Sequence, residues 1–400
     1  MQVKEVKRCL DRVDWDFPGS TTLRSSVHSL HWFPANLLPQ IPAYLVRILS
    51  NEGDLVLDPF CGSGTVGIEA LDASRKVWQG DVCRAAIQVA RGKLPCSFRP
   101  SIAGDLRSFI DKLNWDRLLV SDQCGRTGEG SDPELRSWFS PQTYEQLLYI
   151  WNLVERREYL NSRSVLEMIF SDVLFACAST AASRTATGKK RRHHWGWIAD
   201  NVKPKNLINH NAVGHFRRRL QNALDVIATS RVYLAGQENT CDLGELRREN
   251  AKNTSVPDNS VDLIVTSPPY LGMTDYTLAN RLTYLWMGWP LSDDFREEIG
   301  SRRNRNRKMA KAEYLDEMHY VWAKLSEKLR PNGLCAIVIG ASRKFSDASE
   351  ALIDLISDIG LELLWGPRTR IRSRQRVGNK STRLDTAKEF ICVWRKNNER

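Results

Sequence analysis

Two apolar runs, each ending in an unusual loop, most constrain what this chain can fold into. The first, within residues 56–69 (VLDPFCGSGTVGIE), ends in Asp58 and passes through a glycine-rich loop into an expected helix. The second, residues 261–270 (VDLIVTSPPY), ends in Ser-Pro-Pro-Tyr. Short apolar runs bounded by turn residues are typical of buried parallel strands, and open α/β folds bind ligands where such strands end. The two loops therefore predict one ligand site at the carboxyl edge of a parallel sheet.

The residues after the glycine loop continue an alternation of strand and helix. Residues 76–81 form a second expected strand that ends in Asp81, and an expected helix follows directly. This order of strand, loop, helix, strand and acid is typical of the first half of a doubly wound, Rossmann-like sheet. Near the end of the chain we expect strands at residues 334–342 and 361–367, and a last strand at 389–396 that forms an antiparallel hairpin with its predecessor.

Residues 96–235 interrupt this α/β pattern. They contain helical periodicities, such as those of residues 140–160 and 162–183, and a polar, basic segment, but no strand that ends in a functional loop. We therefore expect a mostly helical insertion between residues 1–95 and residues 236–400, with the sheet resuming near residues 232–234. In the last part we expect a long helix over residues 310–330 and a turn at 331–333.

The composition is that of an ordinary globular chain with an excess of positive charge. The 400 residues are 42% hydrophobic and 26% charged, and the formal net charge of +11 favours a polyanionic partner. No apolar run approaches the ~20 residues that span a membrane, and the N-terminus lacks the apolar core of a signal peptide. Nine cysteines without a Cys-x-x-Cys pair favour reduced thiols in a cytoplasm.

Together the two loops resemble those of the DNA amino-methyltransferases, which transfer a methyl group from S-adenosylmethionine to an exocyclic base nitrogen. The resemblance covers about residues 26–90 and 245–400. It implies a class I methyltransferase sheet, with residues 1–95 as the cofactor-binding half and 236–400 as the catalytic half. It also implies double-stranded DNA as the partner, a prokaryotic cytoplasm with the chain at the nucleoid, and a role in restriction–modification or phage defence beside a cognate restriction endonuclease.

The glycine loop suits S-adenosylmethionine rather than a nucleotide phosphate. Gly62 and Gly64 have no Cβ and let the backbone approach a ligand closely. Asp58 can hold the loop or accept from the cofactor's amino group, and Asp81 is placed to accept from the ribose hydroxyls. No lysine occupies the position that a phosphate-binding P-loop requires.

Further cofactor contacts follow from the resemblance. Residues 28–36 match the family's N-terminal motif, with Asn36 where the family usually has Lys, and Asn250 stands where an acid reads the adenine. The implied contacts are Phe33, Pro34, Asp58, Pro59, Phe60, Gly62, Gly64, Thr65, Asp81 and Asn250.

The second loop suits an exocyclic amine as the methyl acceptor. Such an amine is weakly nucleophilic because its lone pair is delocalised into the ring, so a site must accept its hydrogens and hold the nitrogen in line. Ser267 Oγ and the Pro268 carbonyl are suitable acceptors on a loop that the prolines stiffen. Tyr270 offers a face on which an extruded base can stack. We expect the catalytic residues to be Ser267, Pro268, Pro269 and Tyr270.

Three basic runs, at residues 189–192, 302–308 and 368–383, are candidates for contact with DNA. Such runs are often only solvated surface, but cations also contact phosphates without reading the sequence. The candidate DNA-binding residues are Lys189, Lys190, Arg191, Arg192, Trp195, Arg303 and Arg305. Because the insertion lies between the two motif regions, it is the candidate target-recognition region.

Several alternatives stay open at this point. Serine before the two prolines, in place of aspartate, favours cytosine N4 over adenine N6. The rivals are a tRNA-type base-amine methyltransferase and a basic nucleic-acid-binding module without turnover. Pro95-Cys96 suggests cytosine carbon-5 methylation, but it lies away from the second loop. The histidines lack partners at ligand spacing, so we expect no metal; those concerned are His193, His194, His210 and His215.

Overall fold

A seven-stranded sheet in the order β3-β2-β1-β4-β5-β7-β6 forms the centre of the protein. The computed structural model describes residues 3–17, 26–114, 132–182, 194–229, 244–340, 342, 344–371 and 388–397. The strands are β1 (Leu55–Asp58), β2 (Lys76–Asp81), β3 (Gly244–Arg248), β4 (Val261–Thr266), β5 (Leu329–Gly340), β6 (Leu361–Ile371) and β7 (Lys388–Lys396). Strands β1 to β5 pair in parallel, whereas β7 is antiparallel to both of its neighbours. The predicted Rossmann-like α/β sheet and its terminal hairpin are confirmed.

Helices cover both faces of this sheet, which explains why its central strands β1 and β4 are largely apolar. One face packs against α1 (Val3–Asp11), α2 (Gln40–Leu49) and α3 (Thr65–Asp72), and the other against α15 (Ala310–Lys328) and α16 (Ala348–Asp358). Side chains alternate between the two faces of a strand. Val56 accordingly joins the first core and Leu57 the second.

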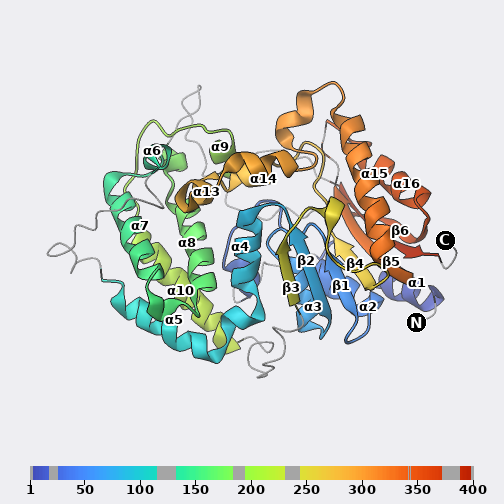
Figure 1. Ribbon diagram of the computed structural model, residues 1–400, viewed down its shortest axis with the longest axis horizontal. Coiled ribbons are helices and arrows are strands. Elements are labelled where there is room, and N and C mark those ends of the chain that lie inside the picture. Colours follow the sequence, from blue (N-terminus) through green and yellow to red (C-terminus); the bar gives the residue numbers. More distant parts are fainter. Residues whose placement is uncertain are drawn as a thin grey trace.

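A group of helices lies beside the sheet, at one side of the molecule (Figure 1). They are α5 (Pro100–Lys112), α6 (Pro133–Arg136), α7 (Pro141–Val154), α8 (Arg163–Cys177), α9 (Trp195–Ala199) and α10 (Ala212–Thr229). Their core continues into α4 (Arg84–Lys93) and α13 (Arg281–Met287), and the short helices α12 (Tyr276–Ala279) and α14 (Leu291–Glu297) flank α13 along the chain. Helices from both motif regions therefore hold this group against the sheet. Among the described residues, no helix is long and apolar enough to cross a membrane.

The structure contains an edge strand that the sequence did not predict. The strand expected near residues 232–234 lies outside the described residues, and the strand that pairs with β2 is β3. β3 forms an edge of the sheet and has no buried residue, so it carries no apolar run that would mark it. The expected turn at residues 331–333 lies within β5 as an irregularity, where the register against β4 shifts and Asn332 has φ +62°.

Two helical glycines give opposite predictions for stability. A Cβ on Gly92 of α4 would lie 2.5 Å from Met168 Cβ and 2.7 Å from the Ser164 carbonyl on α8, whereas one on Gly104 of α5 would meet nothing within 4 Å. Gly92→Ala should therefore destabilise the protein by ~1–3 kcal/mol through overpacking. Gly104→Ala should stabilise it by ~0.5–1 kcal/mol, because alanine is the better helix former. Urea unfolding measures the change in the free energy of unfolding for each variant. Equal changes in the two variants would contradict the close packing of α4 on α8.

Candidate functional site

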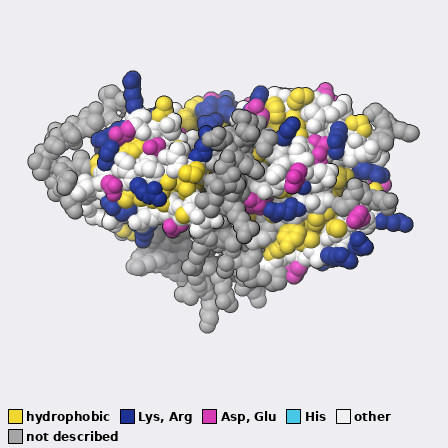
Figure 2. All heavy atoms as spheres, turned by 90° about the horizontal axis from the view of Figure 1, so that it is seen from below, with side chains coloured by type: hydrophobic (Ala, Val, Ile, Leu, Met, Phe, Trp, Pro, Cys, Tyr) yellow, Lys and Arg dark blue, Asp and Glu magenta, His cyan; other side chains and the backbone are white. Residues whose placement is uncertain are grey.

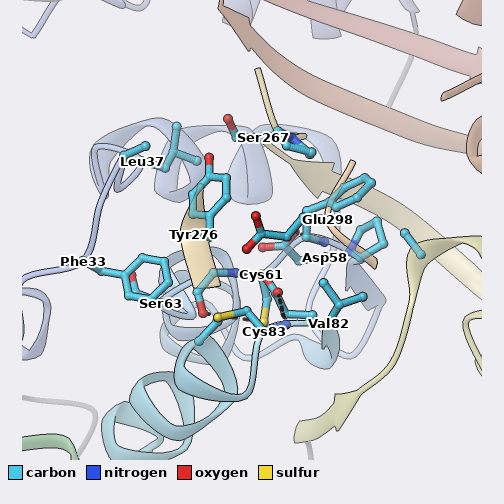
Figure 3. Close-up of a pocket in the computed structure, with 18 of the residues that line it drawn as sticks. Phe33, Leu37, Asp58, Cys61, Ser63, Val82, Cys83, Ser267, Tyr276 and Glu298 are labelled. Carbon is cyan, nitrogen blue, oxygen red and sulfur yellow. Dashed lines mark hydrogen bonds between the residues drawn. The ribbon is translucent and has the colours of Figure 1, made fainter. Parts of the chain in front are cut away.

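One cavity opens at the carboxyl ends of β1, β2 and β4 (Figure 3). Its empty volume is about 880 Å³ including its open mouth. The sheet order reverses between β1 and β4, the position where such folds bind ligands. The residues singled out from the sequence that line it are Phe33, Pro34, Asp58, Pro59, Phe60, Gly62, Thr65, Asp81, Asn250, Ser267 and Pro269. The fold thus brings both loops to one cavity.

A hydrogen bond between Asp58 and Thr266 joins the ends of β1 and β4. Thr266 Oγ1 donates to Asp58 Oδ1 at 2.6 Å, and the same oxygen accepts from the Phe60 backbone N–H at 3.3 Å. Burial raises the pKa of Asp58 to about 7, although both hydrogen bonds act to lower it. The two loops are therefore held together by one buried carboxyl group.

Asp81 fixes the glycine loop to the end of β2. Its Oδ2 accepts from the Gly62 backbone N–H and its Oδ1 from the Cys83 backbone N–H, both at 2.9 Å. A carboxylate oxygen has more than one lone pair, so each can still accept from a ligand hydroxyl. Burial raises the pKa of Asp81 to about 6, while its backbone hydrogen bonds oppose this change.

Gly64 is not among the described residues that line the cavity, and its contact with the cofactor remains a prediction from the sequence. Its φ is +78°, and a Cβ there would lie 3.0 Å from Ala90 Cβ on α4. Glycine is needed at this position for the left-handed turn into α3 and for packing against α4. The loop glycine that lines the cavity is Gly62, with φ +49°.

Residues 28–36 form one wall of the cavity. The Phe33 ring stacks on Tyr276 with centroids 6.4 Å apart and an interplanar angle of 20°. Asn36, which stands where lysine was expected, accepts from Ser63 Oγ at 2.8 Å and so ties this wall to the glycine loop.

Helix α8 holds this wall in place, which the sequence did not reveal. His31 Nε2 and Ser171 Oγ share a hydrogen bond of 2.7 Å, and the Trp32 backbone N–H donates to Asp172 Oδ1 at 2.8 Å. The Trp32 ring stacks on Phe175 at 3.7 Å between centroids. The helical region thus positions part of the cavity that the sheet cannot reach.

The segment after the second loop supplies lining residues that sequence reasoning missed, namely Tyr276, Glu297 and Glu298. Asn250 Nδ2 donates to Glu297 Oε2 at 2.5 Å, while its own Oδ1 accepts from the Lys252 backbone N–H at 3.0 Å. Burial raises the pKa of Glu298 to about 8, against the lowering effect of its hydrogen bonding to Thr277. Two acids at the end of a short helix usually face solvent, so no sequence signal marked them.

The second loop carries a directed chain of hydrogen bonds. Ser267 Oγ donates to the Tyr270 hydroxyl at 3.2 Å, and that hydroxyl donates to Glu389 Oε1 at 3.4 Å. Glu389 is buried in an ion pair with Arg370. The Tyr270 ring lies against β5, where a Cβ on Gly340 would fall 2.1 Å from it. Because its hydrogen is directed to Tyr270, Ser267 Oγ keeps its lone pairs for another donor.

The other residues of this loop have supporting positions. The Tyr314 hydroxyl of α15 donates to the Pro269 carbonyl at 3.1 Å. Pro268 and Tyr270 are not among the residues that line the cavity. Of the four expected catalytic residues, Ser267 is therefore the one that presents a hydroxyl to the cavity.

The structure separates the candidate DNA-binding residues into three groups. Lys189, Lys190, Arg191 and Arg192 lie outside the described residues. Trp195 begins α9 and lies 5.8 Å from the Arg302 guanidinium, which also pairs with Asp200. Arg303 and Arg305 are on the short helix Arg302–Asn306, shortly after Glu298 in the chain.

Comparison with known proteins identifies a matching family. A protein-family model described as a DNA methylase (N6_N4_Mtase) matches residues 10–93 and 261–400, which is more than half of the chain. A curated relative, the Type II methyltransferase M.MjaII of Methanocaldococcus jannaschii, is 20% identical over 406 residues, covering 82% of this chain and 75% of that protein.

Solved structures give weaker likenesses. A SAM-dependent methyltransferase of Methanosarcina mazei is 12% identical, covers 91% of this chain and 100% of its own, and has a TM-score of 0.32. A provisionally assigned DNA modification methylase of Thermus thermophilus, solved with S-adenosyl-L-methionine, is 20% identical, covers 36% of this chain and 48% of its own, and has a TM-score of 0.20. With scores this low, the fold assignment rests on the strand order itself.

The buried carboxyl groups of the cavity predict a pH dependence of stability. Asp58, Asp81 and Glu298 have pKa values of about 7, 6 and 8 in the folded protein, above the ~4 of an unfolded chain. Each therefore contributes stability that is fully present below about pH 4 and is lost as the pH rises through its folded value. Glu298→Gln cannot titrate, so the stability of the parent relative to this variant should fall between about pH 5 and pH 9.

Thermal unfolding of both proteins without ligand measures this difference. The comparison with the variant is needed because burial lowers the pKa of His28 and of His31. These histidines make the stability of the parent rise with pH, which opposes the effect of Glu298. A difference between the two melting temperatures that does not change with pH would contradict the burial of Glu298.

Proposed function

Because the chain belongs to the DNA methylase family of N6/N4 amino-methyltransferases, we propose that it methylates the N4 nitrogen of cytosine at a specific site in DNA. The family membership establishes the coarser reaction, methylation of an exocyclic base amine in DNA with S-adenosylmethionine as the methyl donor. The choice of N4 is supported by serine at position 267, where aspartate is the alternative. The observation that carries the proposal is the position of Ser267 Oγ, in the same cavity as Asp58 and Asp81.

The residues of the cavity fit S-adenosylmethionine, which supplies an electrophilic methyl group on a sulfonium ion. A nucleoside with positive charge needs aromatic surface, acceptors for its ribose hydroxyls and negative charge. Phe33 and Tyr276 supply the aromatic surface, and the oxygens of Asp81 retain acceptor capacity. Asn250 presents an amide to the same cavity, where it suits the adenine edge.

Glu389 orients the hydroxyl groups that receive the acceptor amine. Its carboxylate accepts from Tyr270, which in turn accepts from Ser267, so the lone pairs of Ser267 Oγ can accept a hydrogen of the base amine. A hydrogen bond of this kind leaves more electron density on the nitrogen and holds its lone pair in one direction. The Ser267 hydroxyl thus accepts a hydrogen bond from the amine nitrogen, which must lose a proton once it is methylated.

The rival functions are less well supported. The family model that fits is that of a DNA methylase, which favours DNA over RNA as the substrate. A module without turnover would have no need for Ser267, Tyr270 and Glu389 in one directed chain. The likeness to a type II methyltransferase supports a site-specific modification enzyme, and we extend the proposal to a partner endonuclease of the same specificity.

We propose that DNA contacts the short helix Arg302–Asn306. It borders a groove lined by Arg281, Arg302, Arg303, Arg305 and Asp200. On the face shown in Figure 2, by contrast, basic side chains are scattered among acidic ones over the described residues. The helical region of residues 96–235 is the proposed reader of the target sequence, and the phosphate contacts expected of residues 189–192 remain a prediction from the sequence alone.

Nucleoside analysis tests the proposed function. DNA and RNA from cells that express the chain, in a host without its own base-amine methylation, would be digested and examined by mass spectrometry. N4-methylcytosine in DNA, absent with Ser267→Ala, is the expected result. N6-methyladenine would contradict the choice of base, and a methylated RNA base with unmodified DNA would contradict the proposal as a whole.

Two variants of Tyr270 separate its hydroxyl from its ring. Tyr270→Phe keeps the ring but loses the hydrogen bond that orients Ser267, so the rate at saturating substrate should fall ~10-fold. Tyr270→Ala also removes a stacking face worth ~1–3 kcal/mol, which should lower the rate or DNA affinity by a further ~10- to 100-fold. Cofactor affinity, measured by calorimetry, should be unchanged in both. A phenylalanine variant with the parent rate would show that the hydrogen-bond chain has no catalytic role.

The basic helix predicts a salt-dependent contribution to DNA binding. Changing Arg303 and Arg305 to alanine should weaken binding to all sequences and reduce the slope of log affinity against log salt by up to ~0.9 per phosphate contact. Arg307→Ala is the matched control, because Arg307 pairs with Glu313 at 2.9 Å. Binding isotherms over a salt series give the slopes. Equal slopes for the double variant and the control would assign these arginines to solvated surface.

A further inference from the structure

Glu298 places a carboxyl group in the cavity that the protein itself does not fully satisfy. Its Oε1 accepts from the Thr277 backbone N–H, and the Thr277 side chain also hydrogen-bonds to the carboxyl group. Its Oε2 is shielded from solvent, and no cation among the described residues forms an ion pair with it. Figure 3 shows this group pointing into the cavity between Tyr276 and Asp58. A carboxyl group buried without a counter-charge is costly to ionise, so its retention in a ligand cavity indicates that a ligand supplies positive charge.

The surroundings of Glu298 define the charge of that ligand. The charged groups that act on it most strongly are Asp275 and Asp81, and Asp58 lines the same cavity. The cation that pairs with Asp275 is Arg302, which also pairs with Asp200. No lysine or arginine is among the described residues that line the cavity, so its carboxyl groups make it a site for a positively charged group.

The position of Glu298 in the cavity indicates which positively charged group of the cofactor it contacts. Asp81 suits the ribose, and Phe33 is on the wall expected at the methionine end. The sulfonium of S-adenosylmethionine lies between these two ends and must face Ser267. Glu298 reaches the cavity between Tyr276, which stacks on Phe33, and the strand-end acids.

We propose that Glu298 binds the sulfonium charge of S-adenosylmethionine and makes the site prefer this cofactor to its neutral thioether product. The inference rests on the proposed methyl transfer, in which the methyl group leaves the sulfonium and the sulfur becomes a neutral thioether. Loss of that charge removes the partner of Glu298, so the product binds more weakly and leaves. Glu298 is thus a cofactor-binding residue that also favours product release.

Paired titrations with S-adenosylmethionine and S-adenosylhomocysteine test this role. The two ligands share the ribose, the adenine and the ammonium group, and differ in the methyl group on sulfur and the positive charge that it gives the sulfonium. Glu298→Gln should weaken binding of S-adenosylmethionine ~10-fold or more, with less than ~3-fold change for S-adenosylhomocysteine. Glu317→Gln, which removes a surface acid paired with Lys252, is the matched control and should change neither affinity.

Equal weakening of both ligands would assign Glu298 to a group that they share and overturn the proposal, as would unchanged binding.

If the Glu298→Gln variant does not fold, a measurement on the parent protein still tests the proposal. Burial raises the pKa of Glu298 to about 8, so the cationic cofactor should displace a proton at about pH 7. Calorimetry in two buffers of different ionisation enthalpy should detect this release with S-adenosylmethionine and not with S-adenosylhomocysteine. Equal release with both would overturn the proposal, whereas a parent that shows this pattern but leaves DNA unmodified would contradict only the proposed function.

Discussion

The hydrogen bond from Thr266 to Asp58 is the interaction on which the rest of the site depends. It joins residues 208 positions apart at the place where the sheet order reverses. The pairing of Val56 with Leu263 and of Leu57 with Ile264 brings β1 and β4 to the same level at this edge. The glycine loop and the Ser-Pro-Pro-Tyr loop begin at the two ends of this bond, so the cofactor and the acceptor base can share one cavity.

The proposed roles in binding and catalysis belong to two separate sets of charges. Asp58, Asp81 and Glu298 line the cavity, where burial raises their pKa values and a cationic ligand relieves the cost of ionising them. The ion pair of Glu389 and Arg370 lies behind the second loop and orients Tyr270 and Ser267. The first set can therefore attract a positively charged cofactor without removing the acceptor capacity that the base amine needs.

The sequence predicted those parts of the molecule whose local pattern is specific. Apolar runs located β1 and β4, because strands buried on both faces must be apolar. The alternation of strand and helix located β2, and Asp58 and Asp81 were placed at the ends of β1 and β2. β3 escaped notice because an edge strand can be polar. Glu298 and Tyr276 reach the cavity only through the tertiary path of residues 271–299, which no local pattern records. The packing of Gly64 against Ala90 was also not predicted, because Ala90 belongs to another helix.

The cofactor affinity of Thr266→Val tests most directly whether this bond organises the site. Valine keeps the size of threonine but cannot donate to Asp58, which would leave that buried carboxyl group without its shortest hydrogen bond. The loss is worth ~1–3 kcal/mol, so the dissociation constant of S-adenosylmethionine should rise by roughly 10- to 100-fold while the sheet remains folded. A folded variant with the affinity of the parent would contradict the account, since the two loops would then come together without this bond.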